Sequence, residues 1–219
     1  MPRIIKSAKG SFTSSSVTID SSGRVITASS GAGGAVMTPK VFATGPATGT
    51  YTSNGNTVTI FAASGGGGGA GVDTSGPNNT NGGAGGYGVQ GIFTDSITPP
   101  FSQPYAVGAP GARGNRAIPG NAGSAGGATN VANLITLNGG NAGNAGPEQA
   151  PGNPGNPGTA AEGTFLKTYN ANANQGSEIS DSDIPNMTGR FGLGGQGMQR
   201  SNRNGSAGGA GFLYIFDNG

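Results

Sequence analysis

"GAPGARGNRAIPGNAGSAGG" occupies residues 108–127 and places glycine at every third position, with Ala117 in the one slot that breaks the series. A period of three fits the polyproline II helix, which has three residues per turn and forms no hydrogen bonds within itself. When such a helix is buried, its backbone groups need partners on neighbouring segments. Glycine every third residue leaves one side without Cβ atoms, so a neighbouring helix can approach closely enough for backbone hydrogen bonds.

Five further runs share this spacing, and inserts of about ten to thirty residues separate most of the runs. They begin at Gly65, Gly82, Gly140, Gly189 and Gly205. A collagen triple helix needs glycine without interruption around one axis, so the inserts favour a single chain folded back and forth. Residues 64–211 are therefore expected to form a polyglycine II bundle, which is a packed array of glycine-rich polyproline II helices, with inserted loops.

The rest of the chain predicts a small antiparallel β module in residues 1–63. Apolar and polar residues alternate on both sides of a turn at 21–23, which indicates a hairpin, and a second pair of strands is expected at 38–43 and 56–63. The apolar stretch 212–217 is expected to pair with 56–63 and complete the module. The predicted fold class is all-β or irregular, with essentially no α-helix.

The order of the runs also predicts where the inserts lie. If the first run leads away from the β module and the sixth returns, inserts 72–81, 127–138 and 198–204 fall at the far tip of the bundle. Inserts 92–107 and 159–188 then lie beside the sheet.

The third and fourth runs are longer than the others and leave two possibilities open. At the rise of a polyproline II helix they would extend about 60 Å, against about 20 to 30 Å for the other runs. Either this long pair projects beyond the bundle, or the stretches "AIPG" at 117–120 and "PEQAP" at 147–151 mark bends.

Composition excludes several classes of function. The chain has 219 residues, a net charge of +2, and neither Cys nor His, so disulfides, thiolate nucleophiles, the usual zinc sites and His-based triads are excluded. We expect no enzymatic activity and no metal or cofactor, because no set of residues offers both a nucleophile and a base. Without a basic cluster we expect no nucleic-acid partner. The longest apolar stretch, 212–216, is too short for a membrane span, so no membrane insertion is expected.

Three acidic residues, Glu178, Asp181 and Asp183, are spaced closely enough to suggest a calcium site. No EF-hand glycine or terminal bidentate glutamate accompanies them, so a solvated loop is the favoured interpretation.

Three stretches resemble a known family. They are "TGTYTSNGNTVTIFAASGGGGGAG" at 48–71, "GGAGFLYIFDNG" at 208–219 and "VTIDSSGRVITASSG" at 17–31. The first two resemble glycine-rich tail-fibre and adhesin proteins of tailed bacteriophages of the T-even type. The third is similar to an element in virion proteins of phages that infect marine cyanobacteria.

The resemblance implies a virion protein, made in the host cytoplasm, whose loops contact the host surface from the tip of a polyglycine II bundle. Expected partners are other virion proteins and a bacterial surface glycan or outer-membrane receptor. The protein is expected as a monomeric cap or a trimer. Two other functions stay open: a capsid or tail decoration protein, and an ice-binding bundle with a flat face of small residues.

Candidate contact residues follow from the expected position of each insert. The tip inserts are rich in Asn, Ser, Thr and Arg, which offer donors and acceptors to sugar hydroxyls or phosphates, although Asn and Asp are also ordinary turn residues. The candidate receptor contacts are Asp73, Asn78, Asn79, Asn130, Asn133, Arg200 and Arg203. Phe101 and Tyr105, in a proline-rich stretch expected to be a stiff loop, are candidates for docking onto a neighbouring virion subunit.

Overall fold

A computed structural model describes most of the chain: residues 15–19, 25–30, 39–72, 82–115, 117, 120–145, 152–163, 165–169, 192 and 204–218. The chain divides into two units, residues 1–38 and 39–219. The described residues form twelve strands and no helix, so the all-β prediction is confirmed for them. These ranges also contain no helix long and apolar enough to cross a membrane.

The first unit contains one hairpin. Strands β1 (Ser15–Ile19) and β2 (Val25–Ser30) pair antiparallel, with Val17 opposite Ala28. The register shifts between Thr18 and Ile19, next to the turn. A hairpin at this position agrees with the alternation of apolar and polar residues in the sequence.

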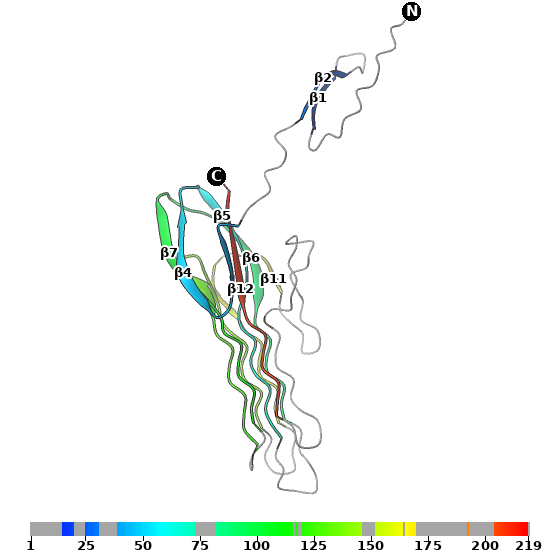
Figure 1. The fold of residues 1–219 in the computed structure, drawn as a ribbon, viewed down its shortest axis with the longest axis vertical. Coiled ribbons are helices and arrows are strands. Elements are labelled where there is room, and N and C mark those ends of the chain that lie inside the picture. The colour runs from blue at the N-terminus through cyan, green and yellow to red at the C-terminus, as the bar shows by residue number, and fades with distance from the viewer. Residues whose placement is uncertain are drawn as a thin grey trace, which may run out of the picture. The chain divides into compact units, whose positions relative to one another are not determined.

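The second unit contains two antiparallel five-stranded sheets. In spatial order, the first sheet contains β11 (Phe165–Tyr169), β6 (Gln90–Ser96), β5 (Thr57–Ala63), β12 (Phe212–Asn218) and β3 (Val41–Thr44). The second contains β10 (Ala160–Glu162), β9 (Ile135–Leu137), β8 (Thr129–Val131), β7 (Phe101–Val107) and β4 (Ala47–Ser53). Figure 1 shows both sheets at one end of this unit.

The C-terminal strand β12 lies at the centre of the first sheet. It pairs along its length with β5, with Ile215 opposite Ile60, which is the pairing expected for 212–217 and 56–63. On its other side β12 pairs with β3. The strands at 41–44 and 57–63 therefore do not pair with each other, because the end of the chain lies between them.

The two sheets pack face to face around one hydrophobic core. In β5 the alternate residues Val58, Ile60 and Ala62 are buried in this core. Leu213 and Ile215 of β12 join them, and β8 and β9 contribute Val131, Ile135 and Leu137 from the opposite sheet. Each of the buried Val, Leu and Ile side chains contributes about 1.5 to 3 kcal/mol on burial.

The β module differs from the one that the sequence predicted, because residues 1–38 form a separate unit and strands from the glycine-rich region join the sheets. Residues 1–63 and 212–217 were expected to form it alone, but strands β6 to β11 come from the inserts of the glycine-rich region. The sequence predicted these inserts as loops, with positions taken from the order of the glycine-rich runs. Their alternating apolar residues are instead buried by sheet pairing, as the burial pattern of β8 and β9 shows.

Seven glycine-rich segments extend side by side from one end of the sheets (Figure 1). We number them in chain order as segments I (64–72), II (82–89), III (108–115), IV (120–128), V (138–145), VI (152–159) and VII (204–211). None of their residues belongs to a β-strand, yet backbone hydrogen bonds join each segment to at least two others.

Segment I lies in the middle of the others. Every backbone N–H from Ser64 to Gly71 donates to another segment, in a repeating order of II, IV and VII, at 2.8–3.0 Å. Segments III and V, which run parallel to segment I, donate to its carbonyls. The five neighbours are bonded to one another in the order VII, III, IV, V and II, and Gly192 bridges II and VII.

The glycines allow this close approach. A Cβ added at Gly68 would collide with the carbonyl oxygen of Ala112, and one at Gly86 would collide with that of Asn156. Because the colliding atoms belong to the backbone, no side-chain rotation could relieve the overlap. The period of three in the sequence therefore coincides with positions where segments touch.

The two long runs bend and fold back on themselves. Ser124 donates to Ala112, and Asn141 donates to Asn156, both at 2.9 Å, which makes IV antiparallel to III and VI antiparallel to V. The chain thus reverses between 115 and 120 and between 145 and 152, at "AIPG" and "PEQAP". Each bend adds one more segment running between the sheets and the far end of the bundle, which the predicted order of the runs did not include.

This extra segment corrects the predicted position of one insert. Residues 127–138 were expected at the far tip, but the reversal brings them back to the sheets, where they form β8 and β9. Inserts 92–107 and 159–169 do lie in the sheets, as expected. The inserts 73–81, 170–188 and 198–203 lie outside the described residues.

Two buried hydroxyls join the sheets to the glycine-rich segments. Thr129 Oγ1 accepts from the Gly108 N–H at 2.9 Å and donates to the Ala63 carbonyl at 2.7 Å. Ser64 Oγ accepts from the Val89 N–H at 2.9 Å and donates to the Asn138 carbonyl at 2.8 Å. Both side chains have 0% exposure. Each hydroxyl thus joins backbone groups that are far apart in the sequence.

Replacing Thr129 with valine should therefore destabilise the protein. Thr129→Val keeps the shape but leaves the buried Gly108 N–H without its hydroxyl acceptor, which costs about 1 to 3 kcal/mol. The free energy of unfolding in urea measures the loss. Thr129→Ser is the control, since it keeps the hydroxyl; equal stability of the valine and serine variants would contradict this role.

Candidate functional site

Two of the seven predicted receptor contacts, Asn130 and Asn133, lie among the described residues. Asn130 lies in β8, opposite Ala106 of β7 and Thr136 of β9. Asn133 is exposed in the turn between β8 and β9 and has a φ of 61°. The remaining candidates, Asp73, Asn78, Asn79, Arg200 and Arg203, lie outside the described residues.

Asn130 and Asn133 therefore belong to the sheets rather than to the far tip of the bundle. The reason is the reversal between 115 and 120, because segment IV then leads back to the sheets where one long outward run was expected. Asn tolerates the left-handed backbone conformation better than most residues, so turn geometry accounts for the residue type at 133. A receptor contact at either residue stays a prediction, and it would involve the side of a sheet.

Phe101 and Tyr105 lie in strand β7, not in a loop as predicted. Both are partly buried against the main core. The Phe101 ring centroid lies 5.9 Å from that of Tyr51, and the Tyr105 ring lies against Gly49 of β4, where a Cβ would collide with it. Both residues thus stabilise the second sheet, and their docking role stays a prediction.

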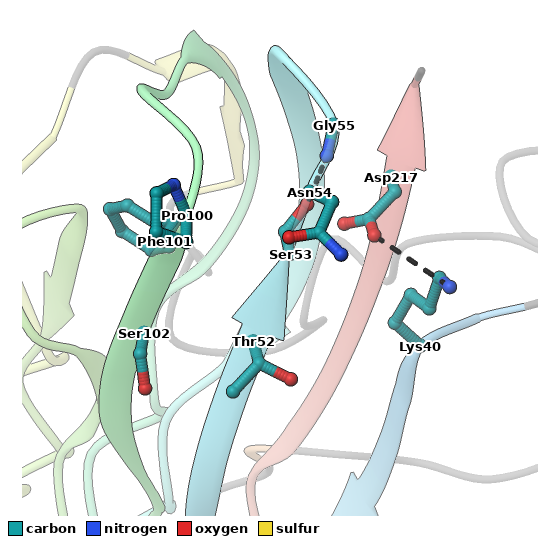
Figure 2. A pocket seen from close by; sticks show the side chains of 9 residues that line it. All are labelled: Lys40, Thr52, Ser53, Asn54, Gly55, Pro100, Phe101, Ser102 and Asp217. Carbon is teal, nitrogen blue, oxygen red and sulfur yellow. Dashed lines mark hydrogen bonds and ion pairs between the residues drawn. The ribbon is translucent and has the colours of Figure 1, made fainter.

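Phe101 also lines a cleft at the end of the sheets farthest from the glycine-rich segments (Figure 2). One wall carries Lys40 at the start of β3 and Asp217 near the end of β12. The other wall consists of residues 100–102, and the turn after β4, residues 52–55, lies between them. The volume of the cleft is about 500 Å³, which is within the range of small-molecule sites.

Asp217 is the charged centre of the cleft. Its Oδ1 accepts a short hydrogen bond from the Tyr51 hydroxyl, and its Oδ2 lies 3.9 Å from Lys40 Nζ. The Asp217 side chain is 12% exposed, whereas that of Lys40 is 60% exposed. Burial, followed by the hydrogen bond to Asp217, raises the pKa of Tyr51 to about 12. Tyr51 therefore remains a neutral donor that fixes one carboxylate oxygen.

Local hydrogen bonds hold the polar side of the cleft. The Gly55 N–H donates to Ser53 Oγ at 2.9 Å, and the Ile97 N–H donates to the Asn56 carbonyl at 2.8 Å. The first bond closes the turn after β4, and the second ties that turn to the connection between β6 and β7. The cleft is thus formed by segments that are already positioned before any ligand binds.

The cleft offers hydrogen-bonding, charged and apolar groups. Its lining combines hydroxyls, one carboxamide, one ammonium, one carboxylate and the apolar surface of Pro100 and Phe101. Among the described residues no group of three or more His, Cys, Asp or Glu could hold a metal ion. Glu178, Asp181 and Asp183 lie outside those residues.

Asp217 was missed from the sequence, although a signal existed. In "FLYIFDN" the alternation places residue 217 on the same face as Leu213 and Ile215, which point into the core. A carboxylate at an inward-facing position needs partners. Its partners could not be identified because Lys40 and Tyr51 are distant in sequence.

A second notable surface is the outer face of the first sheet. Ile92, Phe61, Tyr214 and Phe42 lie opposite one another on four neighbouring strands. Tyr214 is 6% exposed, but Phe42, whose ring lies edge-on to it at 4.5 Å, is 63% exposed. Phe42 is the large hydrophobic side chain that the described part of the chain leaves most open to solvent.

The raised pKa of Tyr51 predicts a change of stability with pH. Its ordinary value is 10.0, so between pH 10 and 12 the unfolded chain loses this proton while the folded chain keeps it. The stabilisation is complete below pH 10 and is lost as the pH rises towards 12, by about 3 kcal/mol at 1.36 kcal/mol per pKa unit. The stability difference between the wild type and Tyr51→Phe, measured by urea unfolding, should shrink over this range. A constant difference would contradict the buried donor.

No protein-family model matches the chain, and a search of curated proteins finds no related sequence.

Proposed function

We propose that the chain is a virion protein of a tailed bacteriophage: a tail-fibre or tail-tip adhesin that binds the bacterial surface without catalysing a reaction. Its glycine-rich segments are polyglycine II helices, and exposed connections on this bundle make the contacts. Its partners are other virion proteins and a surface glycan or outer-membrane receptor.

One observation carries the polyglycine II part of the proposal, namely that the hydrogen bonds of segment I rotate among three neighbouring segments. Consecutive N–H groups donate to three different neighbours and return to the first after three residues. A β-strand would alternate between two sides, whereas a helix with three residues per turn directs successive groups in three directions. Five described neighbours and Gly192 around one segment also fit hexagonal packing.

The mechanism is rigid display. Segments I, III and V run away from the sheets, so residues 72, 115 and 145 lie at the far end of the bundle. Loops that are fixed at both ends by bonded segments lose less conformational freedom on binding than loops on a flexible stalk. The resemblance of 48–71 and 208–219 to phage tail-fibre proteins supports host adhesion as the purpose of this display.

The exposed Phe42 favours one alternative, a capsid or tail decoration protein. In this alternative both ends of the second unit contact virion proteins, and no host receptor is involved.

A competition experiment tests the proposal. Host cells incubated with the purified full chain should adsorb phage particles carrying this protein more slowly, because receptors are already occupied. Cells without added protein and cells given the heat-unfolded chain are the controls. Immunogold labelling of intact particles should place the chain at the tail. Unchanged adsorption together with labelling over the whole capsid would overturn the adhesin and favour the decoration protein.

A further inference from the structure

The cleft between Lys40 and Phe101 lies far from the connections proposed to contact the host, and that proposed function does not use it. Its lining residues come from the ends of β3, β4, β7 and β12 that point away from the glycine-rich segments. It combines polar, charged and apolar lining residues. Its chemistry therefore calls for a separate explanation.

Charge limits the class of ligand. The lining contains one ammonium and one carboxylate, and these already face each other across 3.9 Å. Asp217 is further held by Tyr51, so its negative charge is compensated inside the protein. A phosphate or carboxylate ligand would have to compete with Asp217 for Lys40, and a cation would have to compete with Lys40 for Asp217. The cleft thus favours a neutral ligand.

The remaining groups define what that neutral ligand must offer. Thr52 and Ser102 contribute hydroxyls, and Asn54 contributes a carboxamide; all three residues are exposed. Figure 2 shows the Asn54 side chain between the two walls. These groups can both donate and accept, and sugar hydroxyls also do both. Pro100, which is exposed, offers an apolar surface for the C–H face of a ring, whereas the Phe101 ring lies against Tyr51 and the core.

The cleft is also rigid enough to discriminate between ligands. Phe101 is held against Tyr51 and the core, and the turn at 53–56 is closed by its own hydrogen bonds. The free-energy cost of ordering the protein when a ligand binds here is therefore small. From these observations we propose that the cleft binds one uncharged hexose unit of a glycan, with the ring on Pro100 and its hydroxyls on Asn54, Thr52 and Asp217.

Saturation-transfer NMR on the full chain tests this proposal. The probes are uncharged methyl glycosides of glucose, galactose, mannose and N-acetylglucosamine, each at about 10 mM, which saturates a site with a Kd of about 1 mM. At least one glycoside should receive magnetisation from the protein. Asn54→Ala should weaken its binding about five-fold, which corresponds to one lost hydrogen bond.

The control is Asn141→Ala, the same substitution at an exposed asparagine of segment V. It should leave binding unchanged. Asn54 does not have a positive φ, so alanine there causes no backbone strain and both variants should fold. Thr52→Val is a second variant and should also weaken binding.

Three results would overturn the proposal: no transfer to any glycoside, equal binding by wild type and Asn54→Ala, or stronger binding of glucose 6-phosphate than of the uncharged glycosides. None of them involves host cells. A failed cleft therefore leaves the adhesin proposal standing, and a failed competition experiment leaves the cleft standing.

Discussion

The second unit depends on backbone hydrogen bonds made at a distance that only glycine permits. All eight N–H groups from Ser64 to Gly71 are satisfied by other segments, and a side chain at Gly68 would enter the Ala112 carbonyl. Folding ordinarily depends on burying apolar side chains, but these segments have few to bury. Backbone hydrogen bonds, with weak Cα–H···O contacts, replace much of that stabilisation. They must offset the larger loss of conformational entropy that glycine undergoes on folding.

The sheets provide what the glycine-rich segments lack. A segment of eight residues with no core of its own needs ends that are fixed, and the two sheets fix them through β5, β6, β7 and β12, which lead directly into or out of segments I, II, III and VII. Thr129 and Ser64 satisfy backbone groups where strand pairing changes into the other hydrogen-bond pattern. The cleft at the opposite end uses the same sheets as a rigid frame. The same hydrophobic core thus supports the glycine-rich segments at one end of the sheets and the cleft at the other.

Sequence patterns predicted the parts of this fold that depend on local chemistry. The alternation at 57–63 and the apolar stretch 212–217 identified the central pair β5 and β12, and the glycine period identified the segments. The topology depended on whether "AIPG" bends, and proline and glycine there allow a bend without requiring one. That single ambiguity misplaced Asn130 and Asn133. The cleft was out of reach because Lys40, Tyr51 and Asp217 meet only through pairing between distant strands.

Amide hydrogen exchange measured by NMR tests the central claim most directly. If consecutive N–H groups of segment I are bonded in rotation to three neighbours, all amides from Ser64 to Gly71 should be protected, with no alternation, to an extent comparable with those of β5. Exchange of these amides at the rate of an unstructured chain would contradict the account, as would an alternating pattern in which only every second amide is protected.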